Sequence, residues 1–207
     1  MEKNLIFDRI YVLCLVDKPE RVQNVQDQFK DVDVSIHYTC NKPVLTKFDL
    51  PEIHTGYYNM YNCYDKVIDC ALNHYSIIKE AYNLGLERVL ICEDDISLNN
   101  NFWEGLKLVP NDFDVLKVWS TDYYLLKPWN GERNLFYQNK YRTENLSTLC
   151  YGLSRKGMER YIQIQDEIFS PADLPFFKMY DLNFYRANFK LCEPHNWVSS
   201  ITNEKWI

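Results

Sequence analysis

The chain of 207 residues is 46% hydrophobic and 15% aromatic, which favours one globular domain, residues 1–207, over a disordered segment. Its formal net charge is −6 and no lysine or arginine cluster stands out, so a nucleic-acid-binding protein is not expected. No apolar run approaches the roughly 18 residues of a membrane span, and the amino-terminal residues lack a signal-peptide core. These features predict a soluble, cytoplasmic protein.

Glycine and cysteine usage excludes further classes of protein. The six glycines form no Gly-rich nucleotide-binding loop, which argues against a dinucleotide-binding Rossmann site or a P-loop. None of the seven cysteines lies in a C-x-x-C pair, and most sit within apolar runs. Buried thiols in a reducing compartment are therefore expected, rather than a disulfide framework or a zinc site.

Strands and helices alternate from the start of the chain. The apolar run at 10–16 predicts a strand covered on both faces, a helix is expected after Pro19, and residues 33–39 predict a second strand. Residues 41–64 contain two prolines, a glycine and several tyrosines without a clear period. Such a segment is typical of a long functional loop or lid.

The clearest helix is predicted from about residue 65 to 83, where apolar residues recur at three- and four-residue spacing. Gly85 follows in the position of a C-cap glycine, and a buried strand at 88–92 comes next. Further strands are predicted at 114–119, 148–153 and 187–193, with helices near 155–166 and 173–186. The order predicts an α/β sandwich with a mostly parallel central sheet.

Three carboxylates, Glu93, Asp94 and Asp95, stand at the end of the buried strand. Like charges this close repel unless solvent or a cation separates them. Because side chains alternate along an extended chain, Glu93 and Asp95 are predicted to point one way and Asp94 the other. Two converging carboxylates at a strand end suit a hard divalent cation that also binds phosphate. Acidic residues that merely mark where a strand leaves the core are the alternative.

The stretch DCALNHYSIIKEAYNLGLERVLICEDDISL (69–98) resembles the signature of glycosyltransferase family 25, the lipopolysaccharide and collagen galactosyltransferase family. Its members carry a Cys-x-x-Ser-His helix before a strand that ends in Glu-Asp-Asp, and here Asn73 replaces the serine. Further segments are similar to the family in the same order: IYVLCLVDKPERVQNV, FDVLKVW, STLCYGLSRKGMERYI and SPADLPFF.

The resemblance implies a GT-A-type, Rossmann-like fold and an inverting transfer of a sugar, usually galactose, from a UDP-sugar to a glycan acceptor. It implies a role in cell-surface polysaccharide or lipooligosaccharide synthesis, with contact to the inner membrane only through the acceptor. Mn²⁺ or Mg²⁺ is the implied cofactor. Asp95 is assigned to the metal, Glu93 to metal and donor, and Asp94 to the donor. A non-catalytic nucleotide- or sugar-binding protein of the same fold is the alternative.

The resemblance and the residue chemistry single out five more candidates. Arg21 suits a diphosphate, although it could equally be a solvated charge on a helix. His74 lies on an apolar helix face and is either a core histidine or a site residue. Asp173 is the first choice for the general base. The alternative is that it is only an acidic residue in the first turn of a helix, where the helix dipole favours negative charge. Asp181 is the reserve base, and His195 is a candidate metal ligand.

Aromatic residues complete the predicted site. Tyrosines in the long loop and two tryptophans could stack on the base or the sugar, or pack against their own domain. They are Tyr57, Tyr58, Tyr61, Tyr64, Trp119 and Trp129. A receiver-type domain, which also gathers acids around magnesium, is disfavoured because the first strand ends in Val16-Asp17-Lys18 without an acidic pair.

Overall fold

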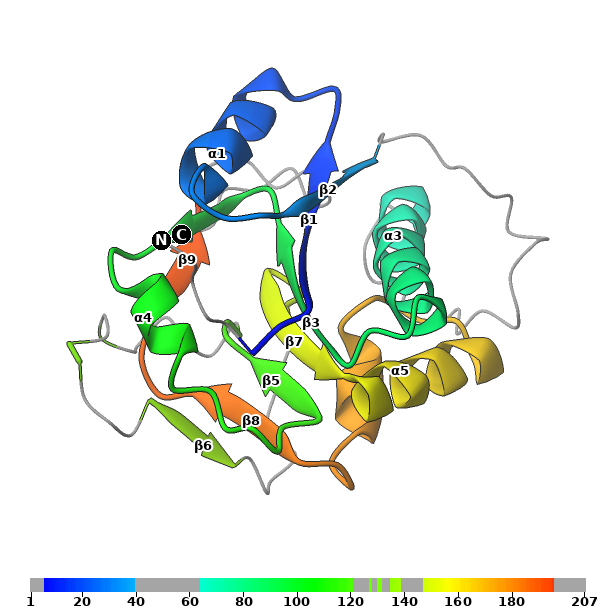
Figure 1. Ribbon diagram of the computed structural model, residues 1–207. Helices are drawn as coiled ribbons and strands as arrows, with labels where there is room; N and C mark the ends of the chain where they lie inside the picture. The colour runs from blue at the N-terminus through cyan, green and yellow to red at the C-terminus, as the bar shows by residue number, and fades with distance from the viewer. Residues whose placement is uncertain are drawn as a thin grey trace.

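A computed structural model describes residues 6–39, 64–120, 127, 130–131, 135–138 and 147–195 of the chain. Figure 1 shows a mixed α/β fold built around a central sheet. Its elements are β1 Arg9–Leu15, α1 Pro19–Phe29, β2 Ser35–Thr39, α3 Tyr64–Asn83, β3 Arg88–Glu93, β4 Ile96–Leu98, α4 Phe102–Leu106, β5 Val115–Lys117, β6 Phe136–Gln138, β7 Cys150–Ser154, α5 Arg155–Glu167, the 3₁₀ helix Leu174–Lys178, β8 Phe184–Ala187 and β9 Cys192–Pro194.

The central sheet has seven strands in the order β2-β1-β3-β7-β5-β8-β6. β1 is parallel to β2 and β3, and β5 is parallel to β8, whereas β7 is antiparallel to both β3 and β5. β6 is antiparallel to β8. Five strands therefore run one way and two the other, which confirms the predicted α/β sandwich. The carboxyl ends of the five strands share one edge of the sheet.

Helices cover both faces of this sheet (Figure 1). α1 and α4 contribute to the hydrophobic cluster on one face, together with strand residues such as Val12 and Leu90. α3 and α5 contribute to the cluster on the other face, with Leu13 and Ile91. Because neighbouring strand residues point to opposite faces, a strand buried on both sides reads as the continuous apolar run seen in the sequence.

The predicted helix before β3 is confirmed as α3, and Gly85 ends it. Gly85 has φ +75°, and the backbone N–H of Leu86 donates to the carbonyl of Ala81. A glycine adopts this left-handed conformation without the steric cost that other residues have. The turn directs the chain into β3, which is buried from Val89 to Cys92. The acidic residues therefore leave a strand that is fixed on both faces.

The predicted helix at 173–186 is wrong. A five-residue 3₁₀ helix, Leu174–Lys178, is followed by β8, which pairs with β5 through Val115 and Phe184. Pro175 removes a backbone donor at the start of the segment, and strand pairing with β5 then outweighs local helix preference. The strand predicted at 187–193 overlaps only the last residue of β8 and the first residues of β9. Among the described residues, no helix is long and apolar enough to cross a membrane.

Candidate active site

The three acidic residues lie at the carboxyl end of β3, where Asp94 and Asp95 form a turn into β4. We call Glu93, Asp94 and Asp95 the acidic turn. The predicted alternation of their side chains is wrong, because Asp94 and Asp95 both face Arg21 whereas Glu93 faces His74. Side-chain alternation holds only along extended backbone, and the chain turns directly after Glu93.

Asp94 anchors the acidic turn to neighbouring elements. Its Oδ2 accepts a hydrogen bond from the backbone N–H of Leu15 at 2.7 Å, and its Oδ1 lies 2.7 Å from Nη1 of Arg21. Asn24 of α1 donates to the backbone carbonyls of Asp94 and Ile96. Both carboxylate oxygens of Asp94 thus have protein partners, and its exposed fraction is 3%. We interpret Asp94 as a supporting residue rather than a ligand of the donor.

Arg21 is buried against the acidic turn, with an exposed fraction of 5%. The alternative of a solvated surface charge is therefore wrong. Its Nη1 lies 2.7 Å from Asp94 and 3.5 Å from Asp95. Burial alone would lower the pKa of Arg21, but the two aspartates raise it above its ordinary value. Arg21 fixes both carboxylates, and its contact with a diphosphate stays a prediction.

Arg21→Ala is expected to destabilise the fold by about 3–5 kcal/mol, because it leaves buried carboxylates without their cation. Urea titration would measure this change in the free energy of unfolding. Lys30→Ala removes an exposed cation at the end of α1 and should change it by no more than roughly 0.5 kcal/mol. Adding Asp94→Asn to Arg21→Ala should recover part of the loss. A loss in Arg21→Ala as small as in the control would contradict the buried pair.

Within the acidic turn, Asp95 is in the least favourable electrostatic position for a charged carboxylate. Burial raises its pKa to about 7, with further contributions from the charges of Glu93 and Asp94, against the opposing effect of Arg21. The backbone N–H of His195 donates to the carbonyl of Asp95, so the structure brings these two predicted site residues together. A cation bound beside Asp95 would relieve this excess of negative charge.

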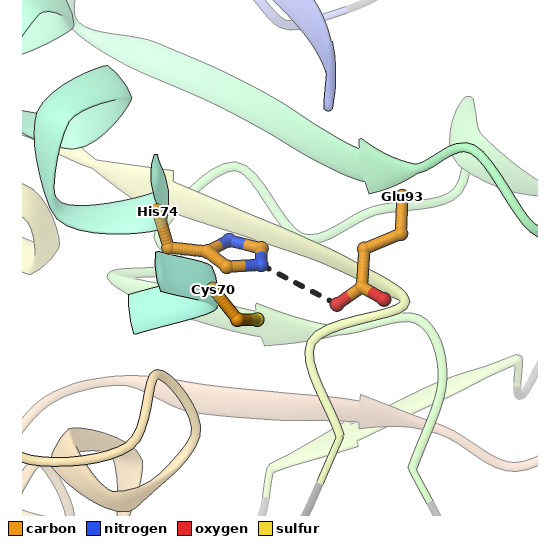
Figure 2. Close-up of side chains that lie close together, drawn as sticks. All are labelled: Cys70, His74 and Glu93. Atoms are coloured by element: carbon orange, nitrogen blue, oxygen red, sulfur yellow. Dashed lines mark ion pairs between the residues drawn. The ribbon is translucent and has the colours of Figure 1, made fainter. Parts of the chain in front are cut away.

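Glu93 faces α3 instead of Arg21. Its Oε1 lies 3.3 Å from Nε2 of His74, and the hydroxyl of Thr148 donates to the same oxygen. Burial opposes the ionisation of Glu93, but His74 and Thr148 outweigh it and lower the pKa. His74 is completely buried, and its Nδ1 lies 2.8 Å from the hydroxyl of Tyr151. Cys70, one helical turn before His74, completes the group that Figure 2 shows.

The segment that enters β7, residues 147–149, joins Glu93 to Asp173. The backbone N–H of Ser147 donates to Oδ2 of Asp173 at 3.0 Å, while Thr148 donates to Glu93. Asp173 precedes the 3₁₀ helix, but its side chain makes no capping hydrogen bond to it. The alternative role of Asp173, an acidic residue that stabilises the start of a helix, is therefore not supported by a capping hydrogen bond. Asp173 is half-buried and lies at the same edge of the sheet as the acidic turn.

Lys117 belongs to this edge and was missed in the sequence. It ends β5, is completely buried, and donates to the backbone carbonyl of Ser147. Its Nζ lies 4.3 Å from the ring centroid of Phe176. Burial lowers the pKa of Lys117 to about 8, although Asp173 and Glu93 act in the opposite direction. The lysine within the apolar run DVLKVW could have identified Lys117 as a candidate site residue, because lysine is rarely fully buried without a specific partner.

The remaining candidates lie at the opposite edge of the sheet, in the hydrophobic core or outside the described residues. Asp181 is exposed and precedes β8, so it lies at the opposite edge of the sheet and is a poor reserve base. Trp119 is buried in the core with an exposed fraction of 1%. The predicted lid at 41–64 lies outside the described residues except for the backbone of Tyr64, which begins α3. Tyr57, Tyr58, Tyr61 and Trp129 also fall outside them.

Cysteines of the described segments are free thiols. Cys14, Cys92, Cys150 and Cys192 are buried, as predicted, and Cys70 is half-buried. Cys92 and Cys150 face each other across β3 and β7, with 3.5 Å between their sulfurs. Burial raises the pKa of both thiols well above the ordinary value, which is typical of inert core thiols.

Comparisons with known proteins identify relatives of this chain. The family model of glycosyltransferase family 25 (LPS biosynthesis protein) matches residues 7–175. A protein of Mus musculus named "Inactive glycosyltransferase 25 family member 3" is 27% identical over 116 residues, covering 51% of this chain and 19% of its own length. Its namesake in Homo sapiens is 26% identical over 119 residues, covering 53% of this chain and 20% of its own length. The chain thus spans about a fifth of the length of these relatives.

Solved structures with a similar course of the chain are distant. A197 from STIV aligns with a TM-score of 0.44 and 10% identity, covering 86% of this chain and 81% of that protein. A glycosyltransferase involved in the glycosylation of the major capsid of PBCV-1 aligns with a TM-score of 0.38 and 11% identity, covering 77% of this chain and 67% of its own. The assignment rests instead on the family model, which matches most of the sequence: the chain belongs to glycosyltransferase family 25.

Proposed function

We propose that the chain transfers a sugar, with galactose as the first candidate, from a UDP-sugar to a glycan acceptor and inverts the anomeric carbon. The observation that carries the proposal is the meeting of Glu93, Asp95 and Asp173 at one edge of the sheet. Ligands of open α/β sheets bind beyond the carboxyl ends of the strands, which is this edge. Membership of the family supports a nucleotide-sugar donor.

Asp95, Glu93 and His195 are the residues that would hold a divalent cation such as Mn²⁺ or Mg²⁺. Carboxylate oxygens suit these hard cations, and the raised pKa of Asp95 reflects negative charge that a cation would offset. When bound, the cation supplies Lewis-acid stabilisation of the charge that develops on the leaving diphosphate. Arg21 and Asp94 hold the turn that presents Asp95.

Asp173 acts as the general base in this proposal. An acceptor hydroxyl oxygen attacks the anomeric carbon, the bond from that carbon to the diphosphate oxygen breaks, and UDP leaves with the bonding electrons. Asp173 takes the proton of the attacking hydroxyl. Its hydrogen bond from Ser147 and the absence of a capping role support this assignment. Lys117 adds a positive charge that interacts with both Asp173 and Glu93.

A non-catalytic protein that binds a nucleotide or a sugar is the second candidate. The names of the mouse and human relatives describe them as inactive, and this observation favours the candidate. The matched region is only about a fifth of those proteins, so their inactivity is not assigned to this chain. The two functions differ in one outcome, since both bind the donor and only the transferase converts it.

UDP is expected to bind at least about tenfold more tightly with Mn²⁺ than with a chelator, a difference of roughly 1.4 kcal/mol. The reason is that Asp95 would hold the cation that also binds the diphosphate, and the pKa of Asp95, about 7, makes protons compete with the metal. The gain should therefore grow as the pH rises from 6 to 8. Calorimetric titration measures both affinities, and uridine, which lacks the diphosphate, is the control. Equal affinities with and without Mn²⁺ would refute a metal-dependent donor site.

A further inference from the structure

Cys70, His74 and Glu93 form a group that the proposed transfer reaction does not require as a unit. Sγ of Cys70, a nitrogen of His74 and a carboxylate oxygen of Glu93 all lie within 4.8 Å of one another. Figure 2 shows the three side chains converging from α3 and from the end of β3. Cys70 and His74 are four residues apart on one helix, so they share a face of α3.

The spacing of these atoms is close to that of ligands around one zinc ion. Zinc lies at about 2.3 Å from sulfur and 2.0–2.2 Å from nitrogen or oxygen, so neighbouring ligand atoms of a tetrahedral site lie roughly 3.3–3.6 Å apart. Nε2 of His74 and Oε1 of Glu93 are separated by 3.3 Å. Sγ of Cys70 lies within 4.8 Å of ligand atoms of both residues, so it would have to move closer to complete the site.

His74 provides the observation that points to a ligand. Its ring is completely buried, and within the described segments Nε2 makes no hydrogen bond of acceptable geometry, although Glu93 is 3.3 Å away. Nδ1, in contrast, is held by the hydroxyl of Tyr151 at 2.8 Å. A histidine that binds a metal through one nitrogen is usually oriented by a hydrogen bond at the other. In the metal-bound state the Nδ1 proton would be donated to the Tyr151 oxygen.

We propose that Cys70, His74 and Glu93 bind a zinc ion, distinct from the cation that accompanies the nucleotide donor. Thiolate and imidazole together select a borderline-soft metal, whereas the residues proposed for the donor cation are mainly carboxylates and include no thiolate. Binding breaks the S–H bond of Cys70 and releases its proton to solvent. One thiolate and one carboxylate then balance the charge of Zn²⁺, so the site is electrically neutral. The three protein ligands leave a fourth position for water.

A zinc ion at this position would also link two elements of the fold. Zinc would tie the middle of α3 to the carboxyl end of β3, next to the acidic turn, and would fix the carboxylate of Glu93. Figure 2 shows that one oxygen of Glu93 faces His74 while the other is turned away from it. The second oxygen is thus directed away from the zinc ligands, which leaves it for the donor cation, so the two sites would share Glu93 but not a ligand atom.

Cobalt substitution tests the proposal directly, because a thiolate bound to Co²⁺ gives an intense near-ultraviolet charge-transfer band. The reduced chain of 207 residues is expected to show this band with one equivalent of Co²⁺ and to lose it when Zn²⁺ is added. Cys70→Ala should remove the band, whereas Cys192→Ala, which changes a buried thiol of β9, should retain it. Tyr151→Phe should keep the band and weaken Zn²⁺ binding by about 10–100-fold, since it removes only the orienting hydrogen bond.

Absence of the band in the unaltered chain, or its persistence in Cys70→Ala, would overturn the zinc site. The first result needs no variant, so the proposal stays testable even if Cys70→Ala fails to fold. Asp95→Asn separates this inference from the proposed function. It should retain the cobalt–thiolate band while losing the Mn²⁺-dependent gain in UDP affinity. Loss of the band in Asp95→Asn would contradict a zinc site distinct from the donor cation.

Discussion

Asp95→Asn is expected to abolish sugar transfer while leaving the fold intact or more stable. The amide keeps the shape of the side chain but removes the charge that would bind the cation, so the Mn²⁺-dependent gain in UDP affinity should disappear as well. Transfer rate and UDP affinity measured on the same variant give both results. Asp181→Asn, which removes an exposed charge at the opposite edge of the sheet, is the matched control and should behave like the unaltered chain.

Stability gives Asp95→Asn a second signature. The folded-state pKa of Asp95, about 7, lies above its ordinary value of 3.8, because burial and Glu93 disfavour the charged form. An acid with a raised folded-state pKa destabilises the fold progressively as the pH rises from about 4 to 7, and the penalty is complete above pH 7. In the absence of metal, the melting temperature of Asp95→Asn should thus exceed that of the unaltered chain at pH 8 and approach it near pH 4. A lower melting temperature at pH 8 would mean that Asp95 is structural.

Asp173→Asn is expected to slow sugar transfer by about 10²–10⁴-fold, the usual effect of removing a general base. The amide oxygen can still accept the hydrogen bond from Ser147, so the loop into β7 should keep its conformation. UDP affinity with Mn²⁺ should remain nearly unchanged, since Asp173 is not among the residues proposed to bind the donor cation. Transfer at saturating donor, measured together with the melting temperature, separates the chemical role from a structural one.

Two outcomes would reassign Asp173. A rate close to that of the unaltered chain would place the base elsewhere, and Glu93, which is linked to Asp173 through residues 147–149, would be the next residue to test. A large drop in melting temperature with a normal rate in the surviving protein would make Asp173 an anchor of Ser147. Ser147 has φ +82°, an uncommon conformation for a non-glycine residue. Its hydrogen bond to Asp173 would then stabilise this conformation.

The sequence predicted the frame of the site because that frame depends on local patterns. The apolar run of β3, the periodicity of α3 and the glycine that ends α3 are all properties of neighbouring residues. They were sufficient to place the acidic turn at the carboxyl end of a buried strand. The helix predicted at 173–186 failed because β8 forms through pairing with β5, a contact between residues about 70 positions apart.

The connections within the site could not be read from local patterns. Arg21 meets Asp94 across 73 positions, and Ser147 meets Asp173 across 26. The spacing Cys70-x-x-x-His74 was visible on one helix face, but its third member, Glu93, comes from the next strand. A search for C-x-x-C pairs alone therefore argued against a zinc site. Lys117 was hidden in an apolar run, where only the folded structure shows its contact with Ser147.

Release of UDP from a nucleotide sugar is the direct measure of whether the acidic turn performs metal-dependent sugar transfer. The measurement compares UDP-, GDP- and CMP-sugars, each with Mn²⁺ and with a chelator, for the unaltered chain and for Asp95→Asn. We expect the unaltered chain to release UDP from a UDP-sugar only with Mn²⁺, and Asp95→Asn to release none. Binding of UDP without turnover of any donor, or equal turnover by Asp95→Asn, would contradict this expectation, and the first of these results would identify a non-catalytic binding protein.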